Sequence, residues 1–191
     1  MAYRDFAALR QINPDVAAWL TLDGTHVDHP VVKGTDNFEY LDRDFYGKTY
    51  AGGTLFLDEQ CPKDFAQEYQ LIHGHHMAGG AMFGDLKKYL DKNFFHKNKG
   101  SAADTEGPIR FGDYRAGIFD AYDSKIYSIN GKKNRPMESF RRCRRKRPVR
   151  GKFRDRLLCL STCSGDMDDR RIVVFCRMTE QEESHTEGRK E

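Results

Sequence analysis

The sequence lacks any run of about 18 or more apolar residues, so none of its segments is long and apolar enough for a transmembrane helix. Met1–Arg10 contains no apolar block, and this excludes a signal peptide there. No internal repeat is visible. With 191 residues, the chain is long enough for one domain with a sizeable core, and we predict a single domain over residues 1–180.

Cysteine is scarce as well. Five cysteines are an odd number, so at least one thiol is free or pairs with another molecule. Cys159 and Cys163 would lie about 13 Å apart on one strand, against the roughly 4.4–6.8 Å that a disulfide permits. For the four cysteines other than Cys163 we predict small buried or loop thiols, because cysteine is commonly buried: Cys61, Cys143, Cys159 and Cys176.

The most informative stretch is Leu157–Arg171, with the sequence LLCLSTCSGDMDDRR. Alternation places Cys159, Ser161 and Cys163 on one face of a strand, and Ile172–Cys176 predicts a second strand. A short polar loop between them would bring Cys163 close to Arg171 at the rim of a sheet. A thiol beside a fixed positive charge is typical of a nucleophilic cysteine.

A nucleophilic cysteine also needs a proton-transfer partner, and LIHGHHM at Leu71–Met77 offers three histidines. Alternation places His73 and His75 on one face and His76 on the other. We predict that the four remaining histidines are ordinary surface or loop residues: His26, His29, His96 and His185.

These motifs resemble those of class B sortases. LSTC at Leu160–Cys163, followed by Arg171-Ile-Val-Val, is similar to the sortase active-site signature, and GHHM at Gly74–Met77 is similar to the histidine motif. The resemblance covers about Asn13 to Met178 and includes further segments upstream and downstream: NPDVAAWL, DHPVV, DNFEYL, GGTLFLD, Met82-Phe83 and Leu86.

The resemblance implies a cysteine transpeptidase that attaches secreted surface proteins to the bacterial cell wall. Cys163 would be the nucleophile that forms a thioacyl enzyme with a C-terminal sorting signal. His75, which follows the glycine of the motif, would be the general acid and base. Arg171 would stabilise the oxyanion, with Arg170 as its competitor. His73 takes a place more often held by tyrosine.

Substrate contacts are predicted at three more positions. Ser161 shares the face of Cys163 and is a candidate to contact the bound peptide. Asn37 and Leu41 would share one face of a short helix or turn over Asp36–Leu41. In one interpretation, Asn37 caps the turn and Leu41 packs in the core. In the other, which the family resemblance suggests, both residues line the substrate groove, and the two interpretations are equally supported.

The fold class that we expect is mainly β. Many short strands predict a closed barrel or a sandwich. The resemblance narrows this to an eight-stranded β-barrel with N-terminal helices and a helix between strands 6 and 7. Met137–Arg147, a basic segment ended by Pro148, would be that helix.

Local patterns predict the remaining elements. Phe6, Leu9 and Ile12 recur at helical spacing within a helical lead-in over residues 1–12. Asn13 and Pro14 favour a second helix, with Val16 and Trp19 facing the core. The other expected elements are two strands within Thr21–Val32, strands at Gly53–Asp58 and Tyr69–His73, an amphipathic helix over Met82–Leu90, an antiparallel meander over Ile109–Ile129 and a disordered polar tail at 181–191.

Two other classes of function were weighed. A zinc site could combine the Leu71–Met77 histidines with Cys159 and Cys163, but the two sulfurs would lie too far apart on a strand for one tetrahedral ion. Binding of an anionic polymer is suggested by eleven basic against two acidic residues between Arg135 and Arg156, while the remainder has a net charge of −6. The basic run Arg141–Arg147 within it lacks interleaved aromatic residues, so we expect no nucleic acid partner.

The resemblance also implies partners and a location. We expect a sorting-signal peptide as substrate and a peptidoglycan precursor or pilin amine as acceptor. We expect a monomer that requires no metal or organic cofactor. An N-terminal anchor, absent from this chain, would hold it on the extracellular face of a Gram-positive plasma membrane. A cytosolic protein would share these sequence features.

Overall fold

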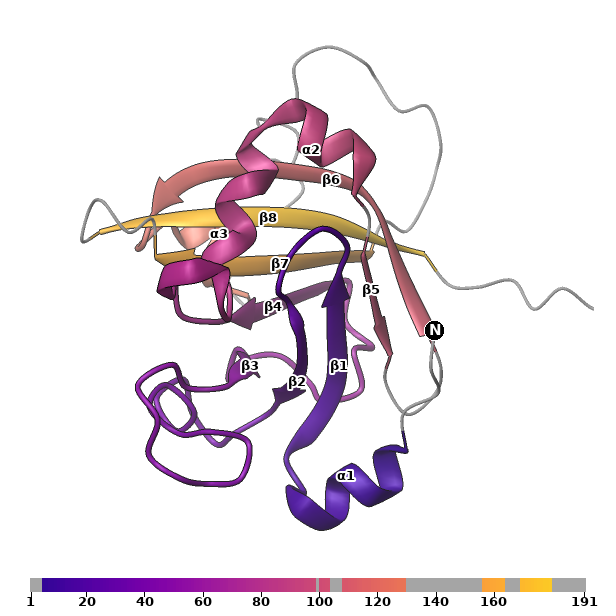
Figure 1. The fold of residues 1–191 in the computed structure, drawn as a ribbon, viewed down its shortest axis with the longest axis vertical. Helices are drawn as coiled ribbons and strands as arrows, with labels where there is room; N and C mark the ends of the chain where they lie inside the picture. The colour runs from indigo at the N-terminus through magenta and orange to yellow at the C-terminus, as the bar shows by residue number, and fades with distance from the viewer. Residues whose placement is uncertain (1–4, 99, 104–107, 130–155, 164–168, 180–191) are drawn as a thin grey trace, which may run out of the picture.

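The computed structural model describes residues 5–98, 100–103, 108–129, 156–163 and 169–179 (Figure 1). Its elements follow the chain in this order: α1 (Phe6–Ile12), β1 (Val16–Leu22), β2 (Asp28–Val32), β3 (Leu55–Leu57), β4 (Tyr69–His73), the 3-10 helices η1 (Ala78–Gly80) and η2 (Gly84–Leu90), α2 (Lys92–Lys97), β5 (Gly100–Ala103), β6 (Pro108–Asp120), α3 (Ser124–Tyr127), β7 (Arg156–Cys163) and β8 (Arg170–Thr179).

Within the described residues, eight strands form a closed barrel in the order β1-β2-β3-β4-β7-β8-β6-β5. Most neighbours are antiparallel, but β2 pairs with β3 and β4 pairs with β7 in parallel. A parallel pair needs a long connection between its strands, because the chain must return to the same end of the sheet. The prediction of an eight-stranded barrel is confirmed.

The N-terminal segment holds one helix among the described residues instead of two. Asp5 caps α1 by accepting a hydrogen bond from the Ala8 N–H at 3.0 Å. The second helix predicted after Pro14 is wrong, because Val16–Leu22 is strand β1. Val16 is buried as predicted, but the Trp19 indole lies part-exposed and donates to Asp28 Oδ1 at 2.6 Å. Pairing with β2 and β5 outweighs the local cap signal.

The apolar stripe within Met82–Leu90 also differs from the prediction. Phe83, Leu86 and Tyr89 are buried, whereas Leu90 is exposed. A spacing of three matches the 3-10 helix η2, in which every third side chain lies on the same face. Met82 has a positive φ of 50° and precedes η2, so it is not part of a regular α-helix.

Other predictions in the chain are confirmed in part. The strands at β3 and β4 lie within the expected ranges, and Asp36–Leu41 forms bends and a turn instead of a helix. The meander is wrong: β6 is one continuous strand with a register shift between Gly112 and Arg115, and it pairs with β8. A helix, α3, does lie between β6 and β7. The basic Met137–Arg147 segment and the polar tail at 181–191 lie outside the described residues.

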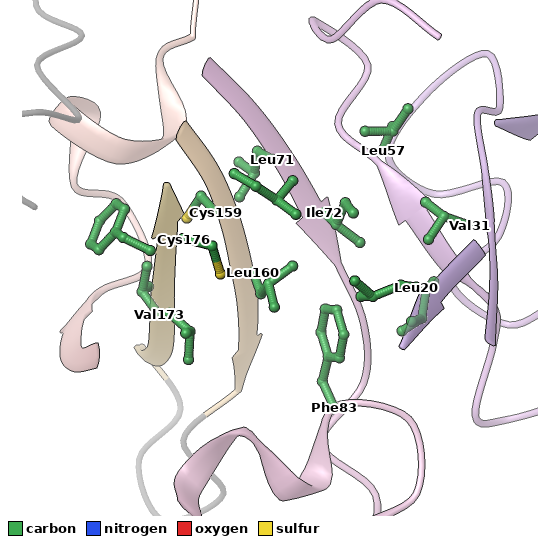
Figure 2. Close-up of a cluster of buried hydrophobic side chains, with 14 of the residues drawn as sticks. Leu20, Val31, Leu57, Leu71, Ile72, Phe83, Cys159, Leu160, Val173 and Cys176 are labelled. Carbon is green, nitrogen blue, oxygen red and sulfur yellow. The ribbon is translucent and has the colours of Figure 1, made fainter. Parts of the chain in front are cut away.

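Strand β7 runs through the core with both faces covered. Every residue from Leu157 to Thr162 is buried, as is typical of a strand with a sheet partner on each side and packing on both faces. Figure 2 shows the side chain of Phe83, the residue before η2, in the same buried cluster as Leu160, Ile72 and Leu20. The segment that follows the histidine motif is therefore anchored in the same core as the cysteine strand.

No helix within the described part of the chain is long and apolar enough to cross a membrane.

Gly74 allows the close packing between β4 and this core. A Cβ at Gly74 would lie 2.4 Å from Leu55 Cδ2 and 2.8 Å from Phe83 Cδ2, and both side chains are fully buried. We expect Gly74→Ala to lower the free energy of unfolding by about 1–3 kcal/mol through overpacking, measured by urea denaturation.

Gly52→Ala is the matched control. Its Cβ would meet the ring of Tyr50, which is exposed and free to turn away. Equal losses in the two variants would contradict the packing role of Gly74.

Candidate active site

The Cys163 thiol lies at the end of β7, where the strand leaves the core. Ser161 and Thr162 are buried, whereas Cys163 is exposed and forms no disulfide. Cys159 lies on the same face four residues earlier and is fully buried. The two cysteines share a face of the strand, and Cys163 reaches solvent because it is the last residue of β7, whereas Cys159 lies within the core.

Arg171 lies directly opposite Cys163. In the antiparallel pair of β7 and β8, Cys163 is in register with Arg171, and on the other edge of β8 Arg170 is in register with Asp120. Paired residues place their side chains on the same face of a sheet, and neighbours along a strand alternate between faces. Arg171 therefore shares the face of Cys163, and Arg170 takes the opposite face.

The histidine motif reaches the same edge of the barrel through the parallel pairing of β4 and β7. His73 is in register with Ser161, and the Gly74 N–H donates to the Ser161 carbonyl at 3.2 Å. His75 lies two residues after the end of β4, and Cys163 is the last residue of β7. The three predicted catalytic positions thus lie at or just beyond the ends of the neighbouring strands β4, β7 and β8.

The His75 imidazole is held by the backbone of the long β2–β3 connection. Its Nε2 lies 2.7 Å from the Leu41 carbonyl oxygen. A carbonyl only accepts, so Nε2 carries the proton and Nδ1 is the basic atom of the neutral ring. The His75 carbonyl in turn accepts from the Phe83 N–H at 2.9 Å, which ties the histidine segment to the core.

A buried carboxylate lies behind His73. Asp58, directly after β3, is 3% exposed and its Oδ2 lies 3.0 Å from His73 Nε2 and 3.1 Å from Asn37 Nδ2. Burial alone would raise the pKa of Asp58, but hydrogen bonds from His73, the Gln60 backbone and Asn37 outweigh it and hold that pKa below its ordinary value. Asp58 is therefore ionised at neutral pH.

Tyr127 connects His73 to the cysteine strand. Its ring stacks on His73 with centroids 6.3 Å apart, and its hydroxyl lies 2.9 Å from Ser161 Oγ. Burial raises the pKa of Tyr127, so the phenol stays protonated. Asp123 caps the short helix α3, which carries the tyrosine. Ser161 itself is 2% exposed, so its hydroxyl is engaged inside the protein.

Sequence reasoning missed Asp58 and Tyr127 as members of this site. Asp58 closes the GGTLFLD segment, and its position at the end of a strand was the available signal. No sequence signal pointed to Tyr127, because its helix lies far from both motifs along the chain.

His76, the third histidine of the motif, does not join this group of contacts. Its Nδ1 is buried without a hydrogen-bond partner among the described residues.

Among the described residues, no group of three or more His, Cys, Asp or Glu side chains is placed to hold a metal ion.

Comparison with known proteins identifies relatives of the whole chain. No family model matches the chain. A class B sortase of Streptococcus pyogenes involved in pilus biogenesis is 32% identical in sequence, with a TM-score of 0.79 over 92% of this chain and 98% of that one. Sortase B of Staphylococcus aureus is 28% identical over 91% of this chain and 74% of its own length.

The chain belongs to the class B sortases. Solved structures of the S. aureus sortase B in complex with a substrate and of a sortase B in complex with triglycine also match this chain. They are 25% identical to this chain, cover 93% of it and 85–86% of their own chains, and have TM-scores of 0.78 and 0.79.

In this sortase, the two predicted groove residues of the β2–β3 connection have different surroundings. Asn37 has both amide ends engaged, since Nδ2 donates to Asp58 and Oδ1 accepts from the Glu59 N–H at 2.8 Å. Leu41 is 40% exposed beside the exposed Phe38, and its carbonyl holds His75. The roles of Asn37, Leu41 and Ser161 in peptide binding stay predictions.

Asp58 makes the free energy of unfolding of this sortase depend on pH. A carboxyl group with a depressed folded-state pKa stabilises the fold fully above its unfolded pKa of about 3.9, and this contribution is lost as the pH falls through the folded value. We expect Asp58→Asn to lower the free energy of unfolding by about 1–3 kcal/mol at pH 7. The difference from the wild type should shrink below about pH 4, measured by denaturant titration across pH.

The control is Asp42→Asn, which changes an exposed aspartate. A difference between Asp58→Asn and the wild type that stays constant down to pH 2 would show that ionisation of Asp58 does not stabilise the fold.

Proposed function

We propose that this sortase is a cysteine transpeptidase in which Cys163 cleaves a C-terminal sorting signal and transfers the acyl group to an amine. The observation that carries the proposal is the exposed Cys163 thiol in register with Arg171, at the edge of the barrel reached by His75. A thiolate near a fixed cation and an imidazole is the arrangement that nucleophilic cysteine chemistry requires.

The reaction has two steps. In the first, Cys163 Sγ attacks the carbonyl carbon of a threonine or similar residue. The peptide C–N bond breaks, a thioester forms, and His75 gives a proton to the leaving amine. In the second, an acceptor amine attacks the thioester, loses its proton to His75 and releases Cys163 with a new amide bond.

Arg171 would stabilise the negative charge that develops on the carbonyl oxygen in both steps. Its guanidinium is always protonated and presents several N–H donors, which suits an oxyanion that exists only during the reaction. The register that places Arg171 on the face of Cys163 supports this role over the neighbouring Arg170.

The partners follow from the relatives. The S. aureus enzyme has been solved with a substrate, a sortase B has been solved with triglycine, and the S. pyogenes enzyme is involved in pilus biogenesis. We propose a sorting signal of the NPxTN type or a related pentapeptide as substrate, and a peptidoglycan precursor or pilin amine as acceptor. The enzyme would act as a monomer, membrane-anchored on the extracellular face of a Gram-positive cell.

The direct test is cleavage of a panel of quenched fluorescent sorting-signal peptides. We expect one peptide motif to be cleaved by the wild type, and Cys163→Ala to lose all cleavage because it lacks the nucleophile. Mass spectrometry of wild type with that peptide should show a thioacyl adduct on Cys163.

Cys61→Ala is the matched control. It removes a buried thiol outside the candidate site and should retain the adduct. Cleavage that survives in Cys163→Ala would refute Cys163 as the nucleophile.

The two neighbouring arginines provide a second test. We expect Arg171→Ala to lower kcat/KM by about 10²–10³, the usual cost of losing one oxyanion donor. Arg170→Ala removes the same charge from the opposite face and should stay within about threefold of the wild type. Equal losses in the two variants would mean that the charge acts at a distance and not as an oxyanion donor.

A further inference from the structure

The ring of His73 is fixed on three sides. Phe56 of β3 packs on it with centroids 5.3 Å apart and planes 32° apart, and Tyr127 stacks on it at 6.3 Å and 16°. Asp58 holds Nε2 at 3.0 Å. An imidazole confined between two rings and bonded at one nitrogen has little freedom to rotate, so the direction of its other nitrogen is set by the fold.

That other nitrogen, Nδ1, is open to a ligand. It makes no hydrogen bond to the described residues and is not among the buried polar atoms without a partner, so it reaches solvent. The His73 side chain is 23% exposed. His73 ends β4 two residues before His75, and its cross-strand neighbour Ser161 lies two residues before Cys163 at the end of β7. Two strand residues span about 7 Å, within reach of a peptide that is bound at Cys163.

The protonation state of this nitrogen is dictated by Asp58. An ionised carboxylate only accepts hydrogen bonds, so Nε2 carries the proton of the neutral ring and Nδ1 presents a lone pair. Asn37 donates to the same carboxylate oxygen. A single buried carboxylate therefore orients both an imidazole and an amide at the predicted groove.

We propose that His73, oriented by Asp58, is a specificity-determining residue that accepts a hydrogen bond at Nδ1 from an N–H or O–H group of the sorting signal. The inference rests on the proposed function. A tyrosine, which is more common at this place in the family pattern, presents a hydroxyl that both donates and accepts. A neutral His73 only accepts at Nδ1, so it should favour a donor in the peptide and disfavour a carboxylate.

The other titratable groups packed around the ring are Asp58 after β3 and Tyr127 of α3. Asp58 is ionised and Tyr127 is protonated at neutral pH, so Asp58 keeps the proton of the neutral ring on Nε2 and leaves Nδ1 as the acceptor.

The test uses peptides of the cleaved motif that carry Asn or Asp at one varied position at a time. We expect the wild type to prefer Asn over Asp about tenfold in kcat/KM at pH 8 at one position, the effect of one hydrogen bond, and mainly through KM. In His73→Phe the Asn:Asp ratio should approach one, and His73→Tyr should accept both peptides.

His96→Gln changes an exposed histidine of α2 and should keep the wild-type ratio. An Asn:Asp ratio in His73→Phe that equals the wild-type ratio at every position would overturn the inference, while the proposed reaction stands. If no peptide forms the thioacyl adduct, the proposed function fails and the inference fails with it.

A second readout does not depend on activity. In protein with ¹⁵N-labelled histidine, NMR should show His73 with unprotonated Nδ1 and protonated Nε2 at pH 8. Asp58→Asn should lose this fixed tautomer, since an amide can donate as well as accept. A proton on Nδ1 of His73 in the wild type at pH 8 would overturn the inference whatever the kinetics show.

Discussion

The parallel pairing of β4 with β7 is the constraint on which the site depends. It joins a histidine motif and a cysteine motif that lie far apart along the chain, and its register alone places His75 and Cys163 at the same edge of the barrel. A slip of one residue would turn Cys163 to the opposite face of the sheet. The fully buried stretch Leu157–Thr162 opposes such a slip, since moving it would force Cys163 into the core and Leu157 out of it.

The same pairing explains which parts could be predicted from sequence. Strand β7 and the approach of Arg171 are encoded locally, because only six residues separate β7 from β8 in the sequence and side chains alternate between the faces of a strand. The helix predicted after Asn13–Pro14 was wrong because the decisive contacts are not local. The helix-cap pattern is present, but Val16–Leu22 gains more from pairing with a strand on both edges, which a local pattern cannot show.

Contacts between distant segments explain what the sequence did not reveal at the site. The Leu41 carbonyl bonds His75 through backbone atoms, which any residue could supply, so no side-chain pattern could predict it. Asp58, Asn37 and His73 meet only after β3 and β4 pair. The sequence shows a histidine at position 73 where the family pattern more often has tyrosine, but it does not show that Asp58 is the hydrogen-bond partner of this histidine. The buried Asp58 carboxylate gives the change a physical basis, because it satisfies an imidazole nitrogen that would otherwise lose its hydrogen bonds on burial.

The contact between His75 and Leu41 bears on the proposed chemistry. Two resting states of the pair, thiolate with imidazolium or thiol with imidazole, would suit a sortase. The Leu41 carbonyl accepts from His75 Nε2 in either state, so it leaves Nδ1 as the atom that would exchange a proton with the amine in the proposed reaction. The long β2–β3 connection would thus contribute to that reaction through its backbone, by orienting the imidazole.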